Sequence, residues 1–309
     1  MRKFYLNFFR INCILCLIFS FPLAGQIVEV PDSSNTGSVK GWEVSSIQVS
    51  TGSASLGESY FNFRKFQKLA PNSFLLNQSY PGYLESNFNI GSDRASVFSF
   101  SVTLNKLRSN RNDIKFSAGF NYFPNISYSS NLSKSTSFPF DTLISTQTGN
   151  AIYFDSIFTS SCVAEYNYDH LRADLNFFFE SKSKTRWTLY GGLGLSIGLS
   201  LKNYITVNFN EWSQIEPRDN SYNYYIPYQQ NYSGLSFGNE VFENRTNASA
   251  ATYLLGGVRF NVSKRNLFWS KVAFFYEIRP SLNYFYFPKL NAYLRAGFMN
   301  QLGVHIRMR

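Results

Sequence analysis

The stretch Trp187–Lys202 reads WTLYGGLGLSIGLSLK and decides the fold. Except at Gly191, large apolar residues occupy every second position from Trp187 to Leu201, and small or polar residues occupy most of the others. A period of two indicates a β-strand with two unlike faces. Ordinary strands are about 5–6 residues long, whereas a tilted strand needs about 9–11 residues to cross a lipid bilayer. This stretch is long enough to predict a membrane-crossing strand.

The same alternation recurs along the chain and predicts eight strands, an even number as in bacterial single-chain barrels. The other seven segments are 42–49, 97–105, 114–122, 171–179, 254–262, 268–279 and 294–308. In the first of them, Val44 and Ile47 have opposite parity. This change predicts a β-bulge near Ser45 or Ser46.

The connections between these segments alternate in length. The short, polar ones are Lys106–Asp113, Ser181–Arg186 and Ser263–Asn266, the long ones are 51–93, 128–163 and 206–248, and the one at 280–290 is intermediate. Short periplasmic turns and long extracellular loops are typical of outer-membrane barrels. We therefore predict an all-β, antiparallel, up-and-down transmembrane β-barrel of eight strands over residues 41–309. Ten strands result if the first and third long loops contain further strands.

The N-terminus predicts export. Arg2, Lys3 and Arg10 precede the apolar run Ile11–Ala24, which is too short to span a bilayer as a helix. Residues 1–25 are therefore expected to be a cleaved signal peptide, followed by a periplasmic segment at 26–40. Cleavage leaves Cys162 as the single cysteine, which excludes an intramolecular disulfide.

Composition supports contact with lipid rather than water. Charged residues make up 16% of the chain and aromatic residues 18%, which is unusual for a water-soluble protein. Aromatic residues gather where the apolar faces end, which predicts two interfacial girdles. The girdle at the short turns comprises Trp187, Phe268 and Trp269, and the girdle at the long loops comprises Tyr122, Tyr166, Tyr168, Tyr204, Tyr253, Tyr284 and Tyr286.

This architecture resembles the OmpA-like outer-membrane barrels and, more narrowly, the PorT-like barrel proteins of Bacteroidota. The likeness covers roughly residues 41–309 and consists of the signal, eight alternating strands and short inner turns. The last residues, LGVHIRMR, lack the terminal aromatic residue common in such barrels. The resemblance implies an outer-membrane location in a Gram-negative bacterium and often no enzymatic activity.

Charged residues recur on the polar faces of the predicted strands. The predicted lumen set is Lys115, Arg172, Asp174, Lys202, Arg259, Lys271, Glu277, Arg279, Arg295, His305 and Arg307. Side chains fill an eight-stranded barrel, and buried charges must pair. We expect a salt-bridged plug, with Asp174 and Glu277 each serving several arginines and Glu277 opposite Arg295. The alternative interpretation is a cationic path for anions.

Catalytic and cofactor signals are weak. His170 and His305 are the only histidines, and no nucleophile-elbow, zinc-protease or Cys/His pattern occurs. Asp169–His170 is expected near the outer rim, which keeps a hydrolase open as an alternative. The glycines from Gly191 to Gly198 lie within a strand and lack the context of a phosphate loop. They are expected to make room for bulky side chains across the lumen.

The sequence leaves three function classes open, none of which needs a cofactor or metal. The first is a non-enzymatic barrel that docks or assembles with other envelope proteins. The second is a transporter for a small apolar or anionic solute, and the third is an outer-membrane hydrolase. The short turns carry basic residues, which suit solubility or contact with lipid headgroups: Lys106, Arg108, Arg111, Lys182, Lys184, Arg186, Lys264 and Arg265. Nucleic acid is not an expected partner despite the net charge of +10.

Overall fold

The chain divides into two units, Met1–Lys40 and Gly41–Arg309. The computed structural model describes residues 42–56, 61–86, 94–106, 114–144, 146, 149, 151–181, 185–218, 235–263 and 265–308. The predicted signal peptide and the segment 26–40 therefore lie outside the described residues, as do most of the basic turn residues. Over the described ranges, no helix combines the length and apolar character needed to cross a bilayer.

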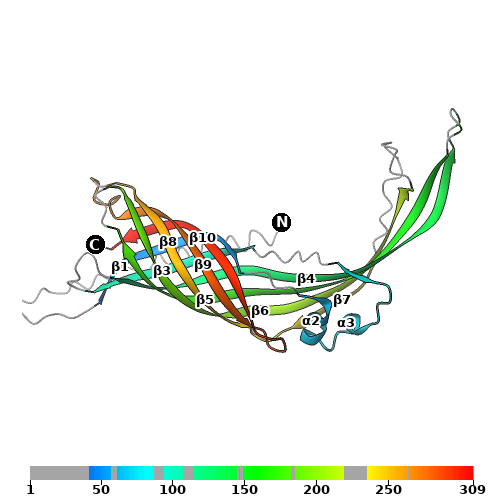
Figure 1. Cartoon of the computed structure of the whole chain (residues 1–309), viewed down its shortest axis with the longest axis horizontal. Helices are drawn as coiled ribbons and strands as arrows, with labels where there is room; N and C mark the ends of the chain where they lie inside the picture. The colour runs from blue at the N-terminus through cyan, green and yellow to red at the C-terminus, as the bar shows by residue number, and fades with distance from the viewer. Residues whose placement is uncertain are drawn as a thin grey trace, which may run out of the picture. The chain divides into compact units, whose positions relative to one another are not determined.

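The described part of the second unit is almost entirely strand. Its ten strands are β1 (Trp42–Ser55), β2 (Leu84–Ser86), β3 (Arg94–Lys106), β4 (Lys115–Ile144), β5 (Ala151–Glu180), β6 (Trp187–Pro217), β7 (Leu235–Glu243), β8 (Ala248–Asn261), β9 (Val272–Tyr286) and β10 (Tyr293–Arg307). Two short helices, α2 (Phe63–Leu69) and α3 (Phe74–Asn77), lie between β1 and β2. Figure 1 shows this arrangement.

Eight of these strands form a closed antiparallel ring. The order is β1, β3, β4, β5, β6, β8, β9 and β10, and β10 pairs again with β1. The prediction of an all-β, up-and-down, eight-stranded barrel is confirmed. Strands β2 and β7 pair with β4 and β6 outside the ring, which accounts for the ten strands considered from the sequence. The predicted bulge is also present, as a register shift between Val44 and Ser46.

The two faces of the barrel strands have the predicted orientation. On β5, Leu171, Leu175 and Phe177 are exposed. The alternate residues Arg172 and Asp174 are buried inside the ring. A water-soluble protein buries its large apolar side chains and exposes its charges, so this barrel has the opposite arrangement.

Glycines on the inner face of β6 make room for larger side chains. A Cβ atom at Gly194 would overlap the ring of Tyr253, and one at Gly198 would overlap the side chain of Arg172. These glycines therefore shape the interior, as the sequence predicted, and lie in a strand with no phosphate loop.

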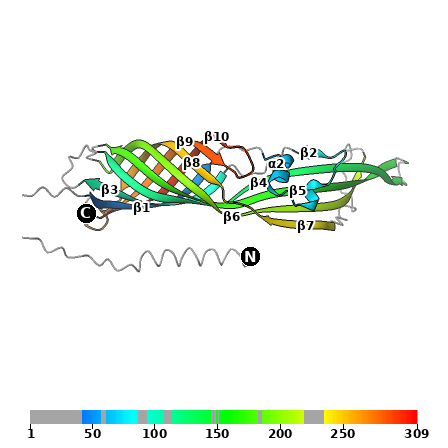
Figure 2. The same ribbon diagram turned by 90° about the horizontal axis from the view of Figure 1, so that it is seen from below.

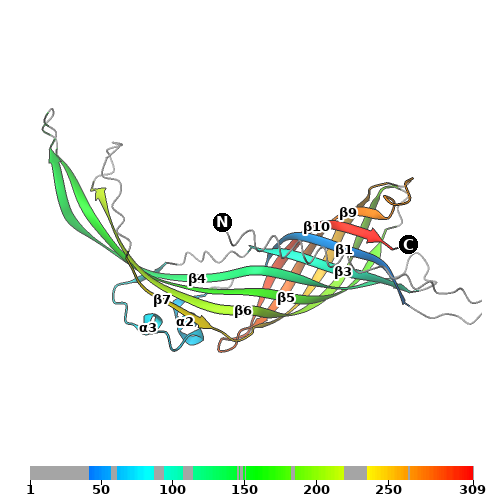
Figure 3. The same cartoon turned by 180° about the vertical axis from the view of Figure 1, so that it is seen from behind.

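Three barrel strands continue far past the rim of the ring (Figures 1 and 3). β4 and β5 each span 30 residues and β6 spans 31. We call the residues beyond the rim the extension; it consists of 125–144, 151–169 and 201–217, with β7 paired to its β6 edge. Register shifts lie at the rim, between Phe123 and Ile126 and between Asn167 and Asp169. Such bulges bend strands and change their parity.

The extension corrects the predicted loops at 128–163 and 206–248, because most of these residues are paired strand. Backbone pairing between β4 and β5 runs from Lys115–Phe178 to Ile144–Ala151. Their Ser-, Thr- and Asn-rich sequence resembled a loop because neither face shows regular hydrophobic alternation. The hydrogen-bond ladder, rather than a hydrophobic period, defines these strands.

Residues 61–86, which we call the lid, pack on the extension (Figure 2). Phe61, Phe66 and Leu76 are at most 2% exposed. The Phe61 ring stacks on Tyr128 at 4.4 Å and meets Phe287 edge-on at 5.4 Å. Burial of this apolar core stabilises the contact between lid and strands.

The core beneath the lid is continuous with the barrel interior at the end from which the extension projects. It includes Ala54, Val97 and Met299 of the ring strands and Cys162 of the extension. Cys162 is fully buried, and this burial raises the pKa of its thiol. The lid therefore closes the ring with apolar side chains at the end from which the extension projects.

The last hairpin differs from its predicted register. Glu277 lies opposite Gln301, and Arg295 lies opposite Asn283. The connection runs from 287 to 292 rather than over the predicted range 280–290. Pro280, the first residue of the predicted connection, lies within β9 opposite Phe298.

Candidate functional site

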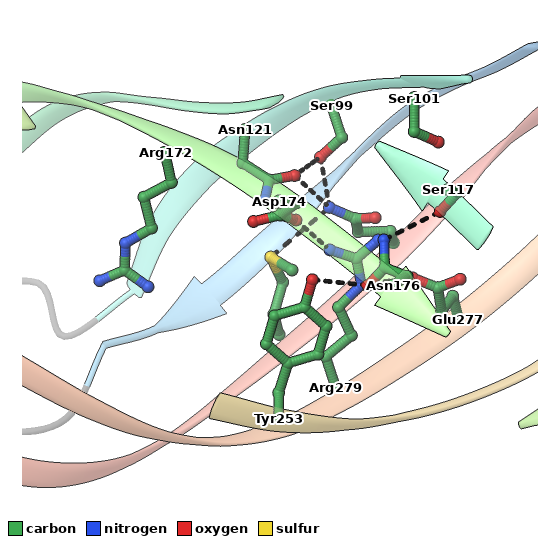
Figure 4. Close-up of polar contacts among 12 residues, drawn as sticks. Ser99, Ser101, Ser117, Asn121, Arg172, Asp174, Asn176, Tyr253, Glu277 and Arg279 are labelled. Atoms are coloured by element: carbon green, nitrogen blue, oxygen red, sulfur yellow. Dashed lines mark hydrogen bonds and ion pairs between the residues drawn. The ribbon is translucent and has the colours of Figure 1, made fainter. Parts of the chain in front are cut away.

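The barrel interior holds a buried ion network centred on Arg279 of β9 (Figure 4). Arg279 Nη1 lies 2.7 Å from Asp174 Oδ2, and Arg279 Nε bonds to Glu277. Asn121 donates to the same Asp174 oxygen, and the Tyr190 hydroxyl donates to Glu277 Oε2 at 3.0 Å. One arginine thus pairs with two carboxylates. The sequence had predicted the reverse, two carboxylates that each pair with several arginines.

Tyr253 belongs to this network and not to a girdle. Its side chain is 6% exposed, and its hydroxyl donates to Asn176 Oδ1 at 2.6 Å. The Arg279 guanidinium lies 5.1 Å from the centre of its ring, a favourable cation–π arrangement. The girdle prediction for Tyr253 is wrong because this residue shares the inward parity of Leu255 and Arg259 on β8.

A second ion cluster lies inside the ring near the short turns. Glu180 bridges Lys115 at 2.6 Å and Arg259 at 2.7 Å. Arg259 is 1% exposed, and its guanidinium lies 5.1 Å from the centre of the Tyr190 ring. Near the same end of the ring, His305 Nδ1 on β10 bonds to the side-chain amide of Gln48 on β1 at 3.1 Å.

Sequence reasoning missed Glu180. It is the last residue of β5 and lies between the predicted strand 171–179 and the predicted turn Ser181–Arg186, although it has the same parity as Asp174 and Asn176. Extending that parity by one step would have found it.

Five members of the predicted lumen set are buried together inside the ring, namely Arg172, Asp174, Arg259, Glu277 and Arg279. Lys115 and Arg307 are half-buried near the short turns, and His305 is buried. These positions follow from the alternation, because successive strand residues point to opposite faces.

Three predicted lumen residues are exposed instead: Lys202, Lys271 and Arg295. Lys202 has a positive φ of 53° at the rim bulge, which turns its side chain out of the ring. Lys271 precedes β9, because the strand begins at Val272 rather than at Phe268. Arg295 keeps inward parity but lies near the start of β10, at the mouth.

The aromatic residues predicted as girdles fall into two groups. The first group is exposed on the outside and comprises Trp187, Phe268, Trp269, Tyr204, Tyr284 and Tyr286. Tyr122 is half-exposed. Phe268 and Trp269 lie in a turn rather than in the predicted strand, because the Asn266 side chain accepts hydrogen bonds from both of their backbone N–H groups. Tyr166 and Tyr168 are buried under the lid, since they share the inward parity of His170.

The adjacent residues Asp169 and His170 point to opposite faces of β5. The Asp169 carboxylate accepts from the Tyr122 hydroxyl at 2.8 Å and lies 3.8 Å from Lys202 Nζ. His170 is 1% exposed, and its Nε2 contacts Ser249 Oγ at 2.7 Å. Among the described residues, His170 Nδ1 has no hydrogen-bond partner. In a hydrolytic triad the carboxylate orients the imidazole, and Asp169 does not do so here.

The site as a whole closes the barrel at three levels. Glu180 holds Lys115 and Arg259 near the short turns, Arg279 joins Asp174 and Glu277 across the middle, and the lid covers the far end. Within the described ranges, no group of three or more His, Cys, Asp or Glu side chains is placed to hold a metal ion. Most charged side chains in the interior are paired, and apolar side chains occupy the end beneath the lid.

Comparison with known proteins adds little to this geometry. No family model matches the sequence, and no curated protein matches it. Among solved structures, one similar chain is OmpT (in-vitro folded), an outer membrane protein of Vibrio cholerae, at 9% sequence identity and a TM-score of 0.12. The alignment covers 84% of this chain and 76% of that chain. A likeness at this score carries no argument, so the class of protein defined here, a plugged and capped eight-stranded β-barrel, rests on the geometry above.

The buried ion network around Arg279 leads to a prediction about the free energy of unfolding. Replacement Asp174→Asn leaves Arg279 with one carboxylate in a buried site, and we expect the free energy of unfolding to fall by about 3–5 kcal/mol. The matched control is Asp155→Asn in the extension, where Asp155 pairs with Arg218 at 2.7 Å on an exposed surface. We expect no measurable change there. Urea unfolding of both variants measures the difference, and equal losses would contradict a structural role for the Asp174–Arg279 pair.

Proposed function

We propose that this chain is a barrel of the outer membrane of a Gram-negative bacterium. An exterior of exposed Leu, Ile and Phe around a polar interior suits hydrocarbon surroundings. Exposed aromatic residues lie at both ends of that exterior, represented by Trp187 and Tyr204, as expected at two lipid–water interfaces. The predicted signal peptide and the resemblance to OmpA-like and PorT-like barrel proteins support the same location.

We propose further that the barrel is non-enzymatic and does not conduct. The observation that carries this proposal is the occupied interior, in which Arg279 bridges Asp174 and Glu277 directly beneath the apolar lid core. A permeating solute would have to separate buried, hydrogen-bonded ion pairs, which is costly in a low-dielectric interior. The role of such a barrel is to anchor in the membrane the extension that projects from it.

The extension is the part of the chain that projects from the barrel and can contact a partner. Its tip exposes the large apolar side chains of Phe138, Phe140, Leu143 and Ile144 on β4, with Tyr153 and Phe158 on β5. Contiguous exposed apolar side chains are typical of protein interaction sites. We propose that the tip docks a protein partner of the cell envelope with a complementary apolar surface.

The contact with that partner is expected to use side chains rather than strand addition. The edge of β4 contains Pro139, and its pairing with β5 shifts register between Pro139 and Asp141. A proline and a bulge are devices that prevent an edge strand from pairing with another chain. The faces of the tip, and not its edge, are therefore the docking surface.

Conductance across a planar lipid bilayer tests the sealed interior. The native protein is expected to insert without stepwise currents. A variant with Lys115, Asp174, Glu180, Arg259, Glu277 and Arg279 all replaced by Ser, and with residues 57–93 replaced by a short Gly–Ser linker, is expected to conduct, because all three levels of closure are removed. Steady currents through the native protein would contradict the proposal and support the transporter alternative.

Photo-crosslinking in intact cells tests the docking surface. A photoreactive phenylalanine analogue at Phe140 is expected to give one discrete protein adduct. The adduct is expected to be lost when Phe138 and Leu143 are also replaced by Ser. The same analogue at Phe74, which is 71% exposed on the lid, serves as the matched control. No adduct at Phe140, or the same adduct at Phe74, would reject the tip as the docking site.

A further inference from the structure

Cations gather at the mouth of the barrel, where the lid meets the connection between β9 and β10. Over the described residues 61–86 and 287–295, the side chains include five cations and one carboxylate. The carboxylate, that of Glu85, accepts hydrogen bonds from the Phe63 backbone N–H at 2.7 Å and from Ser130 Oγ at 2.8 Å. The cations form what we call the basic mouth cluster, which consists of Arg64, Lys65, Lys68, Lys289 and Arg295. This end of the barrel therefore has an excess of positive charge.

Helix α2 of the lid directs three of these cations to one side. Its buried side chains pack into the core beneath the lid. At 3.6 residues per turn, the three basic residues of the helix fall within about 100° of one another on the opposite face. Arg64 and Lys68 are exposed, and Lys65 is partly exposed. A helix with one apolar and one basic face suits an anionic lipid surface.

The connection between β9 and β10 adds Lys289 beside the end of this helix. The Lys289 Nζ donates to the backbone carbonyl of Leu69 at 3.1 Å (Figure 2). An ammonium group has three N–H donors, so this bond leaves capacity for an anion. Within the described part of the chain, no ion pair joins Lys289 or Arg295 to a carboxylate.

Lys65 of the lid and Arg295 of β10 lie close enough to repel each other. Burial lowers the pKa of the Lys65 ammonium, and repulsion from Arg295 lowers it further. Each of the two cations packs on an aromatic ring. The Lys65 Nζ lies 5.5 Å from the centre of the Phe61 ring, and the Arg295 guanidinium lies 5.9 Å from the centre of the Tyr293 ring. An anion that contacts both cations offsets their repulsion and is favoured here.

The outer wall of the barrel next to the basic mouth cluster is apolar. Leu294, which precedes Arg295, is 62% exposed and pairs with the exposed Tyr284. The exposed Tyr286 ends β9, three residues before Lys289. Exposed tyrosines at the end of an apolar exterior are typical of a lipid–water interface. A partner with an anionic head and apolar chains matches this surface better than an acidic protein does, because the positive charge and the apolar wall are adjacent.

We propose that the basic mouth cluster binds the phosphate groups of a phosphorylated glycolipid of the outer leaflet, whose acyl chains lie against the apolar wall at Leu294. The planar guanidinium of Arg295 fits a phosphate, and the lysines supply compact charges. The bound phosphates join the lid to the ring, because three cations of the cluster belong to the lid and two to the barrel. This inference rests on the outer-membrane location proposed above and does not depend on docking at the tip of the extension.

Lipid titration of the full-length protein, followed by native mass spectrometry from detergent micelles, tests this site. The probe is diphosphorylated lipid A, and it is compared with the same glycolipid without its phosphates. We expect the phosphorylated lipid to bind at least about tenfold more tightly, because several cations near an anionic headgroup each contribute to the affinity.

Variants of exposed cations locate the binding. Lys68→Gln combined with Arg295→Gln is expected to lower the affinity for diphosphorylated lipid A by about tenfold. The combination of Lys68→Arg with Arg295→Lys keeps both charges and is expected to retain most of the affinity. The matched control is Lys134→Gln with Arg265→Gln, which removes two exposed positive charges on the extension and at a short turn. We expect the control to bind like the native protein.

Equal affinity for the two glycolipids, or an equal loss of affinity in the control variant, would overturn the proposal. Displacement of the lipid by an equal concentration of inorganic phosphate would overturn it in favour of a free anion, and displacement by polyglutamate would overturn it in favour of an acidic protein. Insertion of the native protein into lipid vesicles is measured in parallel. A chain that does not insert would reject the membrane location as well, whereas insertion without phosphate-dependent binding would reject the lipid site alone.

Discussion

Closure of the strand ring by the pairing of β10 with β1 is the constraint on which the rest of the structure depends. A closed ring leaves no unpaired backbone edge within the barrel, so the exterior can be uniformly apolar. Eight strands also enclose only enough space for side chains. The polar residues directed inward must therefore satisfy one another, and this requirement produces the ion network, the paired amides and the glycines that accommodate Tyr253 and Arg172.

The same constraint explains where the pairing is incomplete. Arg279 pairs with both central carboxylates, and Glu180 pairs with Lys115 and Arg259 near the short turns. Among the described residues, Arg172 is therefore left with one hydrogen-bond acceptor, the neutral side chain of Asn283. A filled interior with one unmatched guanidinium differs from an open cationic channel, whose charges would face water. The lid then closes this interior at the end from which the extension projects.

Much of the barrel could be predicted from the sequence because the two faces of its strands differ in polarity, with large apolar side chains on the outer face and mostly small or polar side chains on the inner face. The alternation in Trp187–Lys202 gave the strand, its parity and the inward glycines, and the parity change after Val44 gave the bulge. The extension and the lid could not be predicted, because their strands and short helices lack a hydrophobic period that one sequence reveals. The bulges at Asn125 and Lys202 also alter parity without a glycine to mark them. Pairing partners such as Arg279 and Asp174 depend on register between distant strands, which the sequence alone does not fix.

The central claim is that the apolar exterior of the ring lies in hydrocarbon while the extension does not. It is tested most directly by fluorescence quenching with lipids brominated near the middle of their acyl chains, in protein with a single tryptophan. We expect strong quenching for a tryptophan replacing Leu195, which is 54% exposed on the outside of β6, and none for the native Trp212 of the extension. Equal quenching at both positions, or none at Leu195→Trp, would contradict the account.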